Sequence, residues 1–530
     1  MQILERTKSV CPVCKRIIDA EIFEENGEVK IRKKCPEHGE FIDKYWEDYE
    51  LYKKMKSYAF DGPGVKNPQF PEFSGVNCPF DCGLCRLHKS HPLLVNMVLT
   101  NRCHLSCWYC FFYAKEGEPI YEPSIEQIEK MLRMLRSLKP VAPNAIQYTG
   151  GEPTLRKDLV EIIQLTKKLG FTHIQLNTTG INLMDKEYTK KLKEAGVNVL
   201  YLSFDGVKKE INTKNHWEIP YILESARYAK LGIVLVPTVI NNWNSEELGD
   251  IINFALNNID IVRSVNFQPV SLVGRMPRKE REKYRITIPG AIKKIEEQTN
   301  GAISKEDWYT IPFVGAISKF VEVLTGKPTF EFSAHPACGM ATYVFLDGEK
   351  VIPITRFIDV EGVIKHLDSA AEEMYNKPAW QRKLIAAKAA LEIVKFIDKE
   401  KAPKGIDFGK LLSNILIKHS YSALGAFHVK TLFLGMMHFM DEYNYDIERV
   451  KRCVIHYVLP DGSEVPFCTF NVFPEIYRDK VQERYAYSPE EWKKLNPGWS
   501  YEGDKYHRDI KKLESGEVYK KTYFNIKRFW

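Results

Sequence analysis

Three cysteines stand close together in the stretch from Asn101 to Cys110, at Cys103, Cys107 and Cys110. Their spacing is C-x3-C-x2-C, and the aromatic Tyr109 directly precedes the last cysteine. A cubane iron–sulfur cluster has four irons and is normally held by four thiolates, so a compact set of three leaves one iron open to a ligand that is not protein. A zinc knuckle or a few buried thiols is the alternative, which cysteine spacing alone leaves open.

Residues 1–60 have the pattern of a small metal-stabilised module. Cys11 and Cys14 form one knuckle and Cys35 with His38 a second, and the residues between them predict a hairpin with an Asn-Gly turn at 26–27. So short a segment has little core, and a structural metal contributes on the order of 10 kcal/mol to folding. We expect one zinc or one rubredoxin-like iron, with His38 as the fourth ligand and a mainly structural role.

A second C-x3-C-x2-C set, Cys78, Cys82 and Cys85, ends a segment rich in proline and glycine. It lacks an aromatic residue before its last cysteine, so we assign it to an auxiliary iron–sulfur cluster, with another zinc site as the alternative. The chain has twelve cysteines and no apolar leader. Metal ligands are therefore favoured over disulfides, because a reducing compartment keeps thiols free.

The last three cysteines, Cys338, Cys453 and Cys468, are far apart in the sequence. Cys453 and Cys468 flank a predicted hairpin that turns at Pro-Asp-Gly-Ser, residues 460–463, and such a hairpin brings both thiols near one metal. Together with Cys338 they predict a third cluster site. Its fourth ligand is open, and His456 is one possibility.

The segment 93–272 alternates short apolar runs with helical periodicity. One intervening helix starts with a capping box, Ser124 with Gln127. Six strand–helix units in order predict a parallel sheet curled into a partial (β/α)6 barrel, with chemistry at the carboxyl ends of the strands. The expected strands are Leu94–Thr100, Ala145–Tyr148, Thr172–Asn177, Val197–Phe204, Ile233–Ile240 and Val262–Pro269.

We therefore predict an α/β protein in four parts. These are the metal-binding module 1–60, the auxiliary cluster segment 61–92, the partial barrel 93–272 and a C-terminal α+β extension 273–530 that carries further cluster ligands. In the extension, a basic loop from Arg275 to Arg285 is either a solvated face or a phosphate site. Apolar residues from Leu411 to Met440 predict helices that either pack on the barrel or line a hydrocarbon tunnel.

Polar motifs follow the ends of the predicted strands. Gly150-Gly151-Glu152-Pro153 follows the second strand; its two glycines let backbone approach a ligand, and its carboxylate can accept from an ammonium. Each of the other polar groups, taken singly, is equally a helix cap or a turn former. Those groups are Asn177, Thr178, Thr179, Gly180, Ser203, Asp205, Asn241, Asn244 and Gln268.

Composition excludes several classes of protein. The chain has 530 residues, 44% hydrophobic and 27% charged, as is typical of a soluble globular protein with more than one domain. The net charge of +7 is spread over many residues, and clustered basic runs are absent, so we expect no nucleic-acid partner. No apolar run is long enough for a membrane helix or a signal peptide, which predicts a cytoplasmic protein.

The first cysteine set with Tyr109 and the Gly-Gly-Glu-Pro segment one β-α unit later resemble the signature of the radical S-adenosylmethionine (radical SAM) superfamily. The resemblance implies a [4Fe–4S] cluster whose open iron takes the amino and carboxylate groups of SAM. Its reduction splits SAM to methionine and a 5′-deoxyadenosyl radical, which takes hydrogen from unactivated carbon. The implied cofactor-contacting residues are Tyr109, Gly150, Gly151, Glu152, Pro153, Asn177, Thr178, Ser203, Asp205 and Gln268.

Over essentially the whole chain, the order of motifs resembles the archaeal tetraether lipid synthases, a type also described as pterin-methylating radical SAM proteins. The shared order runs from the N-terminal knuckles through all the cysteine sets, and includes the segment Gln268 to Arg275. The resemblance implies joining of the terminal methyl carbons of phytanyl chains in archaeal diether phospholipids, giving biphytanyl tetraether lipids. It further implies one or two auxiliary [4Fe–4S] clusters, one mononuclear Fe or Zn, an electron donor such as a ferredoxin, and peripheral contact with the inner face of the membrane.

Three functions follow as hypotheses. Lipid coupling predicts a long apolar cavity at the barrel mouth, with the first radical stored at one of the auxiliary clusters. Methylation of a pterin or another small heterocycle predicts a short polar pocket with aromatic walls. A non-catalytic iron–sulfur electron carrier predicts no SAM cleavage, and the intact Gly-Gly-Glu-Pro segment argues against it.

Overall fold

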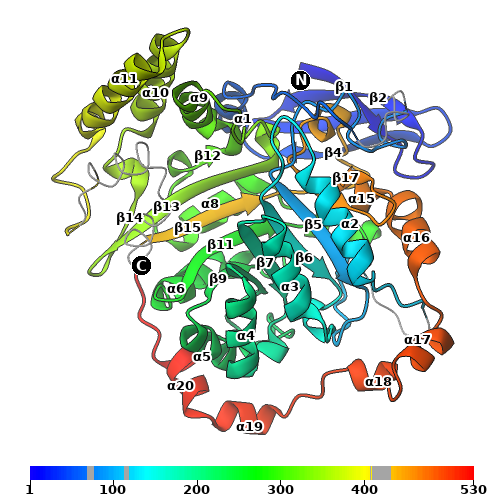
Figure 1. The fold of residues 1–530 in the computed structure, drawn as a ribbon. Helices are drawn as coiled ribbons and strands as arrows, with labels where there is room; N and C mark the ends of the chain where they lie inside the picture. Colours follow the sequence, from blue (N-terminus) through cyan, green and yellow to red (C-terminus); the bar gives the residue numbers. More distant parts are fainter. Residues whose placement is uncertain (69–76, 113–117, 406–407, 409–430) are drawn as a thin grey trace.

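The structure is a computed structural model that describes residues 1–68, 77–112, 118–405, 408 and 431–530. Two sheets organise it (Figure 1). The smaller sheet is four-stranded and antiparallel, with its strands in chain order: β1 (Gln2–Val10), β2 (Ile17–Glu25), β3 (Glu28–Cys35) and β4 (Gly39–Trp46). The larger sheet has 13 strands among the described residues.

The predicted hairpin of the N-terminal module is confirmed. Strands β2 and β3 pair antiparallel up to Glu25 and Glu28. Between them, Asn26 and Gly27 both have positive φ angles, 56° and 80°. Two residues in this left-handed region make the turn whose twist matches that of the flanking strands, and Asn-Gly adopts it at little cost.

All six predicted strands of the barrel are present, and two more run parallel beside them. Every neighbouring pair in this series is parallel. In spatial order the series is β16 (Ile455–Val458), β5 (Leu94–Thr100), β6 (Ala145–Gly150), β7 (His173–Thr178), β8 (Val199–Ser203), β9 (Gly232–Val236), β11 (Val262–Pro269) and β15 (Thr431–Met437).

The C-terminal extension thus completes both sides of the barrel sheet. Strand β13 (Gly339–Asp347) pairs antiparallel with β15, and β17 (Glu464–Pro466) pairs antiparallel with β16. The short strands β10 (Thr238–Val239), β12 (Tyr309–Thr310) and β14 (Lys350–Pro353) pair with β11 and β13. Residues 273–530 therefore share the sheet of the partial barrel.

Helices surround the sheet (Figure 1). The predicted capping box of α2 is confirmed, because Ser124 Oγ accepts from the Gln127 N–H and Gln127 Oε1 accepts from the Ser124 N–H. The helices are α1 (Tyr49–Lys56), α2 (Ile125–Arg136), α3 (Leu159–Lys168), α4 (Lys186–Ala195), α5 (Ile219–Ala229), α6 (Leu248–Asn257), α7 (Arg281–Tyr284), α8 (Ile288–Gln298), α9 (Gly315–Thr325), α10 (Val360–Met374), α11 (Ala379–Glu392), α14 (Ile447–Val450), α15 (Phe467–Val472), α16 (Pro474–Tyr485), α17 (Pro489–Leu495), α18 (Tyr501–Asp504), α19 (Ile510–Ser515) and α20 (Glu517–Phe524).

The prediction of helices from Leu411 to Met440 is wrong where it can be checked. Residues 431–437 form β15, a strand buried between β11 and β13, because a short apolar run does not distinguish a buried strand from a buried helix. Residues 411–430 of that prediction lie outside the described residues. Within the described ranges, no helix is both long and apolar enough to cross a bilayer.

Strand β17 carries a buried carboxyl group that makes stability depend on pH. Glu464 is 3% exposed, and its Oε1 has no hydrogen-bond partner within the described part of the chain. Burial raises the pKa of Glu464 from 4.5 to about 8. Between pH 4.5 and about 8, Glu464 therefore keeps its proton in the folded protein but loses it in the unfolded chain. As a result, the contribution of Glu464 to the free energy of unfolding falls as pH rises from 4.5 towards 8.

Glu464→Gln should remove this pH-dependent loss, since glutamine stays neutral. We expect the variant to gain on the order of a few kcal/mol over the parent at pH 8 and much less at pH 5, at about 1.4 kcal/mol per pKa unit. Guanidinium unfolding midpoints at the two pH values measure the difference. An equal gain at both would show that Glu464 is ionised in the folded protein.

Candidate active site

The loop after β5 carries the first cysteine set into a cavity of about 210 Å³ at the carboxyl ends of the parallel strands. Cys103, Cys107 and Cys110 all line this cavity. The Cys110 N–H donates to the Cys107 carbonyl at 3.3 Å, and the Leu105 N–H donates to Cys103 Sγ at 3.5 Å, so local turns aim the thiols. Burial raises the pKa of Cys103 and Cys107. Three convergent thiols that need a cation to become thiolates fit an iron cluster.

The two glycines that follow β6 bring its end against the cluster loop. Gly150 and Gly151 line the cavity. The Gly151 N–H donates to the Thr100 carbonyl at 2.8 Å, and the next N–H donates to the Arg102 carbonyl, also at 2.8 Å. A Cβ atom at Gly151 would lie 2.0 Å from the Arg102 oxygen. The sequence predicts that these glycines let the backbone come close to a ligand. In the structure they also let the end of β6 pack closely against the cluster loop.

Gly151→Ala should displace the loop that carries the cysteines, because the clash is with backbone. We expect SAM cleavage to fall about 100-fold, the scale of a 1 Å misplacement at a reaction centre. Measuring 5′-deoxyadenosine release and iron content after anaerobic reconstitution tests this. Gly232→Ala is the matched control, since its nearest neighbour is the flexible Arg263 side chain at 3.2 Å. Parent-like cleavage by Gly151→Ala would contradict the packing argument.

The Glu152 carboxylate has a structural role at the ends of two strands. Glu152 is fully buried, and its oxygens accept five hydrogen bonds, from the N–H and hydroxyl of Thr154, the hydroxyl of Thr178, and the N–H and hydroxyl of Thr179. The carboxylate therefore ties the end of β6 to the end of β7. Pro153 begins the adjacent 3₁₀ turn and is buried with it.

Behind the cysteine loop, Tyr109, Asp205 and Lys214 form a partly buried group. The Tyr109 hydroxyl donates to Asp205, and Lys214 Nζ lies 3.1 Å from an Asp205 oxygen and 4.7 Å from the centre of the Tyr109 ring. Burial lowers the pKa of Lys214, but the charges of Asp205, Cys107 and Cys110 and the hydrogen bond to Asp205 together leave this pKa above its ordinary value. Lys214 and Tyr109 line the cavity, whereas Asp205 supports both from behind.

The remaining cavity lining combines amide side chains with aromatic and aliphatic ones. Of the predicted strand-end residues, Asn177, Thr178, Thr179, Ser203 and Gln268 line it. Gln147 Nε2 donates to Asn96 Oδ1 at 2.9 Å, while Gln147 Oε1 has no partner among the described residues. Met437, Phe439 and Met440, from the predicted apolar segment Leu411 to Met440, also line the cavity. The lining residues that the sequence did not single out include Asn96, Gln147, Lys214, Asn266, Phe111, Phe112, Tyr201, Val273, Tyr457 and Phe467.

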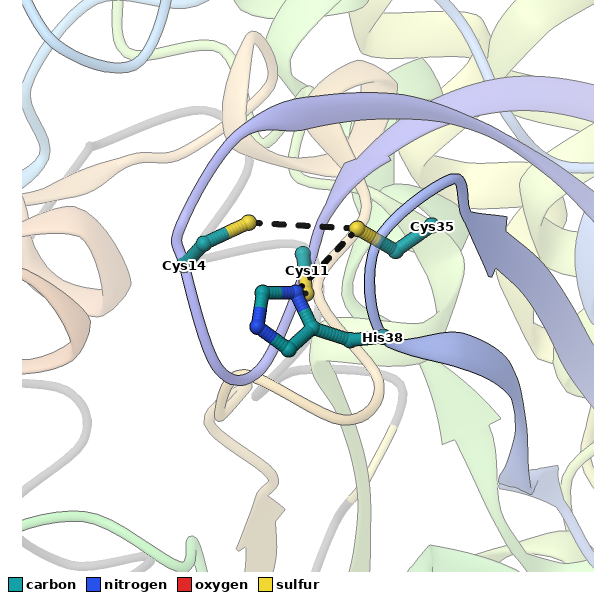
Figure 2. Close-up of side chains that lie close together, drawn as sticks. All are labelled: Cys11, Cys14, Cys35 and His38. Carbon is teal, nitrogen blue, oxygen red and sulfur yellow. Dashed lines mark hydrogen bonds between the residues drawn. The ribbon is translucent and has the colours of Figure 1, made fainter.

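The N-terminal module holds a compact set of metal-ligating atoms (Figure 2). Ligand atoms of Cys11, Cys14, Cys35 and His38 all lie within 4.8 Å of one another. Cys14 Sγ is 3.8 Å from Cys35 Sγ, and His38 Nδ1 is 3.7 Å from Cys11 Sγ and 3.4 Å from Cys35 Sγ. Metal–sulfur bonds of about 2.3 Å in a tetrahedron place ligand atoms at this separation, so the four residues fit one zinc or iron.

Comparison with known proteins agrees with these two sites. The Radical SAM superfamily model matches residues 97–255, and the HMPTM N-terminal zinc ribbon domain model matches residues 3–47. A 7,8-dihydro-6-hydroxymethylpterin dimethyltransferase of Methanocaldococcus jannaschii is 46% identical over 506 residues, which cover 93% of this chain and 97% of that relative. The chain belongs to the radical SAM family of this dimethyltransferase.

Other proteins are similar to a smaller part of the chain. A probable GTP 3′,8-cyclase of Saccharolobus islandicus is 30% identical over 198 residues, which cover 36% of this chain and 62% of that protein. Among solved structures, Streptococcus suis SuiB bound to S-adenosylmethionine is similar over 40% of this chain and 48% of that chain, with a TM-score of 0.33 and 15% identity. As a radical SAM protein, the chain uses SAM and a [4Fe–4S] cluster, and its zinc ribbon is a further metal site.

One auxiliary cysteine set of this radical SAM protein reaches the cavity. Cys453 precedes β16 and Cys468 lies on α15, as the predicted hairpin requires, and Cys468 lines the cavity. Burial, then the charges of Cys468 and Cys338, raise the pKa of Cys453. Arg449 is 1% exposed and donates from Nε to Cys338 Sγ at 3.2 Å. This buried guanidinium would compensate the negative charge of a thiolate-bound cluster at these cysteines.

The set Cys78, Cys82 and Cys85 lies farther from the cavity. The Cys82 N–H donates to the Tyr477 hydroxyl at 3.0 Å. Burial, then the charge of Cys78, raises the pKa of Cys82, and Cys453 contributes to the same rise. The two auxiliary sets are neighbours, because Cys78 and Cys82 pack against the same cluster of buried side chains that contains Cys468.

His456, the possible fourth ligand of the third cluster, contacts His88 through one of its two ring nitrogens. Its Nε2 lies 3.2 Å from Nε2 of His88, which in turn lies 2.9 Å from the Cys453 carbonyl oxygen. Burial lowers the pKa of both imidazoles. Both imidazoles are therefore neutral, and His88 contacts the backbone of Cys453, not its thiol.

The C-terminal tail holds the cluster loop from outside. Asp504 Oδ1 accepts from Arg102 Nη1 at 2.8 Å, and Arg102 Nη2 also pairs with Glu122 at 3.0 Å. The Tyr506 N–H donates to the His104 carbonyl at 3.3 Å. Residues 504–506 thus fix the start of the loop that carries the first cysteine set. They are about 400 residues away in the sequence, and no local motif predicts this contact.

The predicted basic loop is largely neutralised by carboxylates. Arg285 is buried and bonded to Asp441 at 2.6 Å and to Asp43 at 3.1 Å. Arg278 lies 2.9 Å from Glu442. These pairs join the loop to the zinc ribbon and to the segment before α14. Arg278 and Arg285 are therefore already paired with carboxylates, which argues against a phosphate site. The loop instead connects the zinc ribbon with the segment before α14.

Proposed function

We propose that this radical SAM enzyme methylates a pterin or a similar small heterocycle. The observation that carries the proposal is the composition of the cavity lining, which combines amide side chains with aromatic side chains. Asn96, Gln147, Asn177, Asn266 and Gln268 offer donors and acceptors of the kind that an aminopyrimidinone edge requires. The 46% identity to a protein named for pterin dimethylation, over nearly the full length of both chains, supports the same substrate class.

The roles of the cavity residues follow from their positions. Cys103, Cys107 and Cys110 would hold three irons of the cluster. With SAM bound, this group supplies one-electron chemistry and a 5′-deoxyadenosyl radical able to take hydrogen from carbon. The Lys214 ammonium, held by Asp205, would bind a carboxylate in the cavity, such as the carboxylate of SAM.

The other strand-end residues would position and shield the reacting groups. Backbone at Gly150 and Gly151, with side chains of Asn177 and Ser203, would orient the polar parts of SAM. Phe111, Phe112 and other aromatic residues would exclude water from the radical. Each of these roles rests on the geometry of the cavity together with the family signature.

The auxiliary sets would exchange electrons with the substrate. Cys468 reaches the cavity, so a cluster on Cys338, Cys453 and Cys468 is the nearer one, and a cluster on Cys78, Cys82 and Cys85 is its neighbour. The Cys11, Cys14, Cys35 and His38 site would stabilise the module 1–60. We propose the parts 61–92, 93–272 and 273–530 as functional segments, although the last shares the barrel sheet.

A second candidate function is the joining of phytanyl chains into tetraether lipids. One specific observation favours it: an apolar part of the cavity wall, with Val273, Met437, Phe439, Met440 and Phe467, lies beside Cys468. Burying a hydrocarbon tail contributes roughly 0.8 kcal/mol per CH₂. The named relative and the amides weigh towards the heterocycle, so we place lipid coupling second. Both candidates use the same radical chemistry and a reductant such as a ferredoxin.

One experiment separates the two candidates. The protein is reconstituted with iron and sulfide without oxygen and given SAM, dithionite and either 7,8-dihydro-6-hydroxymethylpterin or an archaeal diether phospholipid. Mass spectrometry then follows 5′-deoxyadenosine together with methylated pterin or tail-joined lipid. A methylated pterin supports the proposal. Tail-joined lipid without methylated pterin would replace it by the second candidate, and cleavage with neither product would overturn both.

A further inference from the structure

Helix α11 has an apolar stripe that faces away from the protein. Trp380, Leu384 and Leu391 are 62%, 62% and 72% exposed, and Ala387 lies between them at helical spacing. The opposite face of α11 packs through small buried side chains, Ala386, Ala389 and Ala390. Figure 1 shows α11 with α10 at the outer edge of the molecule, far from the ends of the barrel strands.

Lysines border this stripe on both sides. At 100° per residue, Trp380, Leu384, Ala387 and Leu391 fall within one narrow sector, with Lys383 on one side and Lys388 on the other. Both lysines are exposed. A tryptophan and two leucines with a lysine on each side are the pattern of a helix that lies in the interface of a lipid bilayer.

We propose that α11 docks this protein on an anionic lipid surface. The stripe formed by Trp380, Leu384, Ala387 and Leu391 enters the boundary between headgroups and acyl chains, while Lys383 and Lys388 meet lipid phosphates. The proposal does not depend on whether the substrate is a heterocycle or a lipid. It concerns a surface on α11, away from the cavity.

Charge and size favour a lipid surface over a second copy of the chain. Two copies that met through this stripe would bring Lys383 and Lys388 of each against like charges. A stable dimer also uses roughly 20 to 30 residues on each side, far more than the stripe of four residues supplies. An anionic lipid surface does not need a shape complementary to α11, and its negative potential attracts Lys383 and Lys388.

The test uses the full reconstituted protein and vesicles of phosphatidylcholine, with and without phosphatidylglycerol. In flotation, we expect the parent to bind the anionic vesicles, and salt to weaken that binding. Leu384→Glu should weaken it by at least about tenfold, because a carboxylate would sit among apolar groups in an anionic surface. Leu495→Glu is the matched control, since Leu495 on α17 is also 62% exposed. SAM cleavage should be unchanged in both variants.

Three results would overturn the proposal. The first is parent protein that floats with neither kind of vesicle. The second is Leu384→Glu that binds as the parent does. The third is a parent dimer in sedimentation that Leu384→Glu dissociates while vesicle binding is unchanged, which would assign the stripe to a second copy. Weaker and less salt-sensitive binding by the double variant Lys383→Gln, Lys388→Gln would support the proposed contact of these two lysines with lipid phosphates.

Discussion

Cys107→Ala is expected to abolish SAM cleavage. Cys107 is the middle of three thiols that line one cavity, and without it the radical-forming cluster loses one of its three protein ligands. Release of 5′-deoxyadenosine under reducing conditions should fall at least about 1000-fold, which corresponds to ~4 kcal/mol of lost transition-state stabilisation. An electron carrier without SAM chemistry would show no such loss.

Iron content and spectra provide the control for Cys107→Ala. The variant should lose roughly the four irons of one cubane and keep the signals of its auxiliary clusters in Mössbauer and electron paramagnetic resonance spectra. Retained auxiliary signals show that the chain is folded. Parent-like cleavage by the variant would exclude this cysteine set as the site of SAM cleavage.

Cys468→Ala should separate SAM cleavage from product formation. Cys468 lines the same cavity as the first cysteine set but belongs to the neighbouring set with Cys338 and Cys453. The first set stays intact, so 5′-deoxyadenosine should still form. Product should fall at least about 100-fold, because the substrate radical loses the nearby group that completes its redox change.

The matched control for Cys468→Ala is Asn471→Ala. Asn471 also lies on α15 and lines the cavity, and its side chain donates to the Phe467 carbonyl at 2.9 Å, but it offers no thiol. Asn471→Ala should keep the auxiliary cluster signals. If Cys468→Ala formed product at the parent rate with either substrate, the auxiliary set would have no part in turnover.

Local spacing was enough to predict the metal-binding loops. Cys103, Cys107 and Cys110 lie within one loop, where short turns help to aim the thiols at one cavity. The Asn-Gly turn likewise brings the two knuckles of the N-terminal module together, so Cys35 and His38 meet the other two ligands. Alternating strands and helices also predicted the parallel order from β5 to β11.

The use of each side chain depended on contacts that spacing does not encode. The Glu152 carboxylate accepts hydrogen bonds from three threonines, two of them at the end of the next strand, which the Gly-Gly-Glu-Pro motif alone does not predict. Lys214 carries no motif, and it reaches the cavity because Asp205 holds it there.

The sequence by itself therefore determined the chemistry of this protein: a three-thiol loop for a radical SAM cluster, a metal-bound module and a partial barrel. Tertiary structure alone decided that β15 and β16 extend the barrel on both sides and that Cys468 opens into the cavity. The physical reason is the range of the interactions. Ligands within one loop are fixed by a few backbone turns, whereas strand pairing between residues 94–96 and 455–457 depends on the packing of the whole sheet.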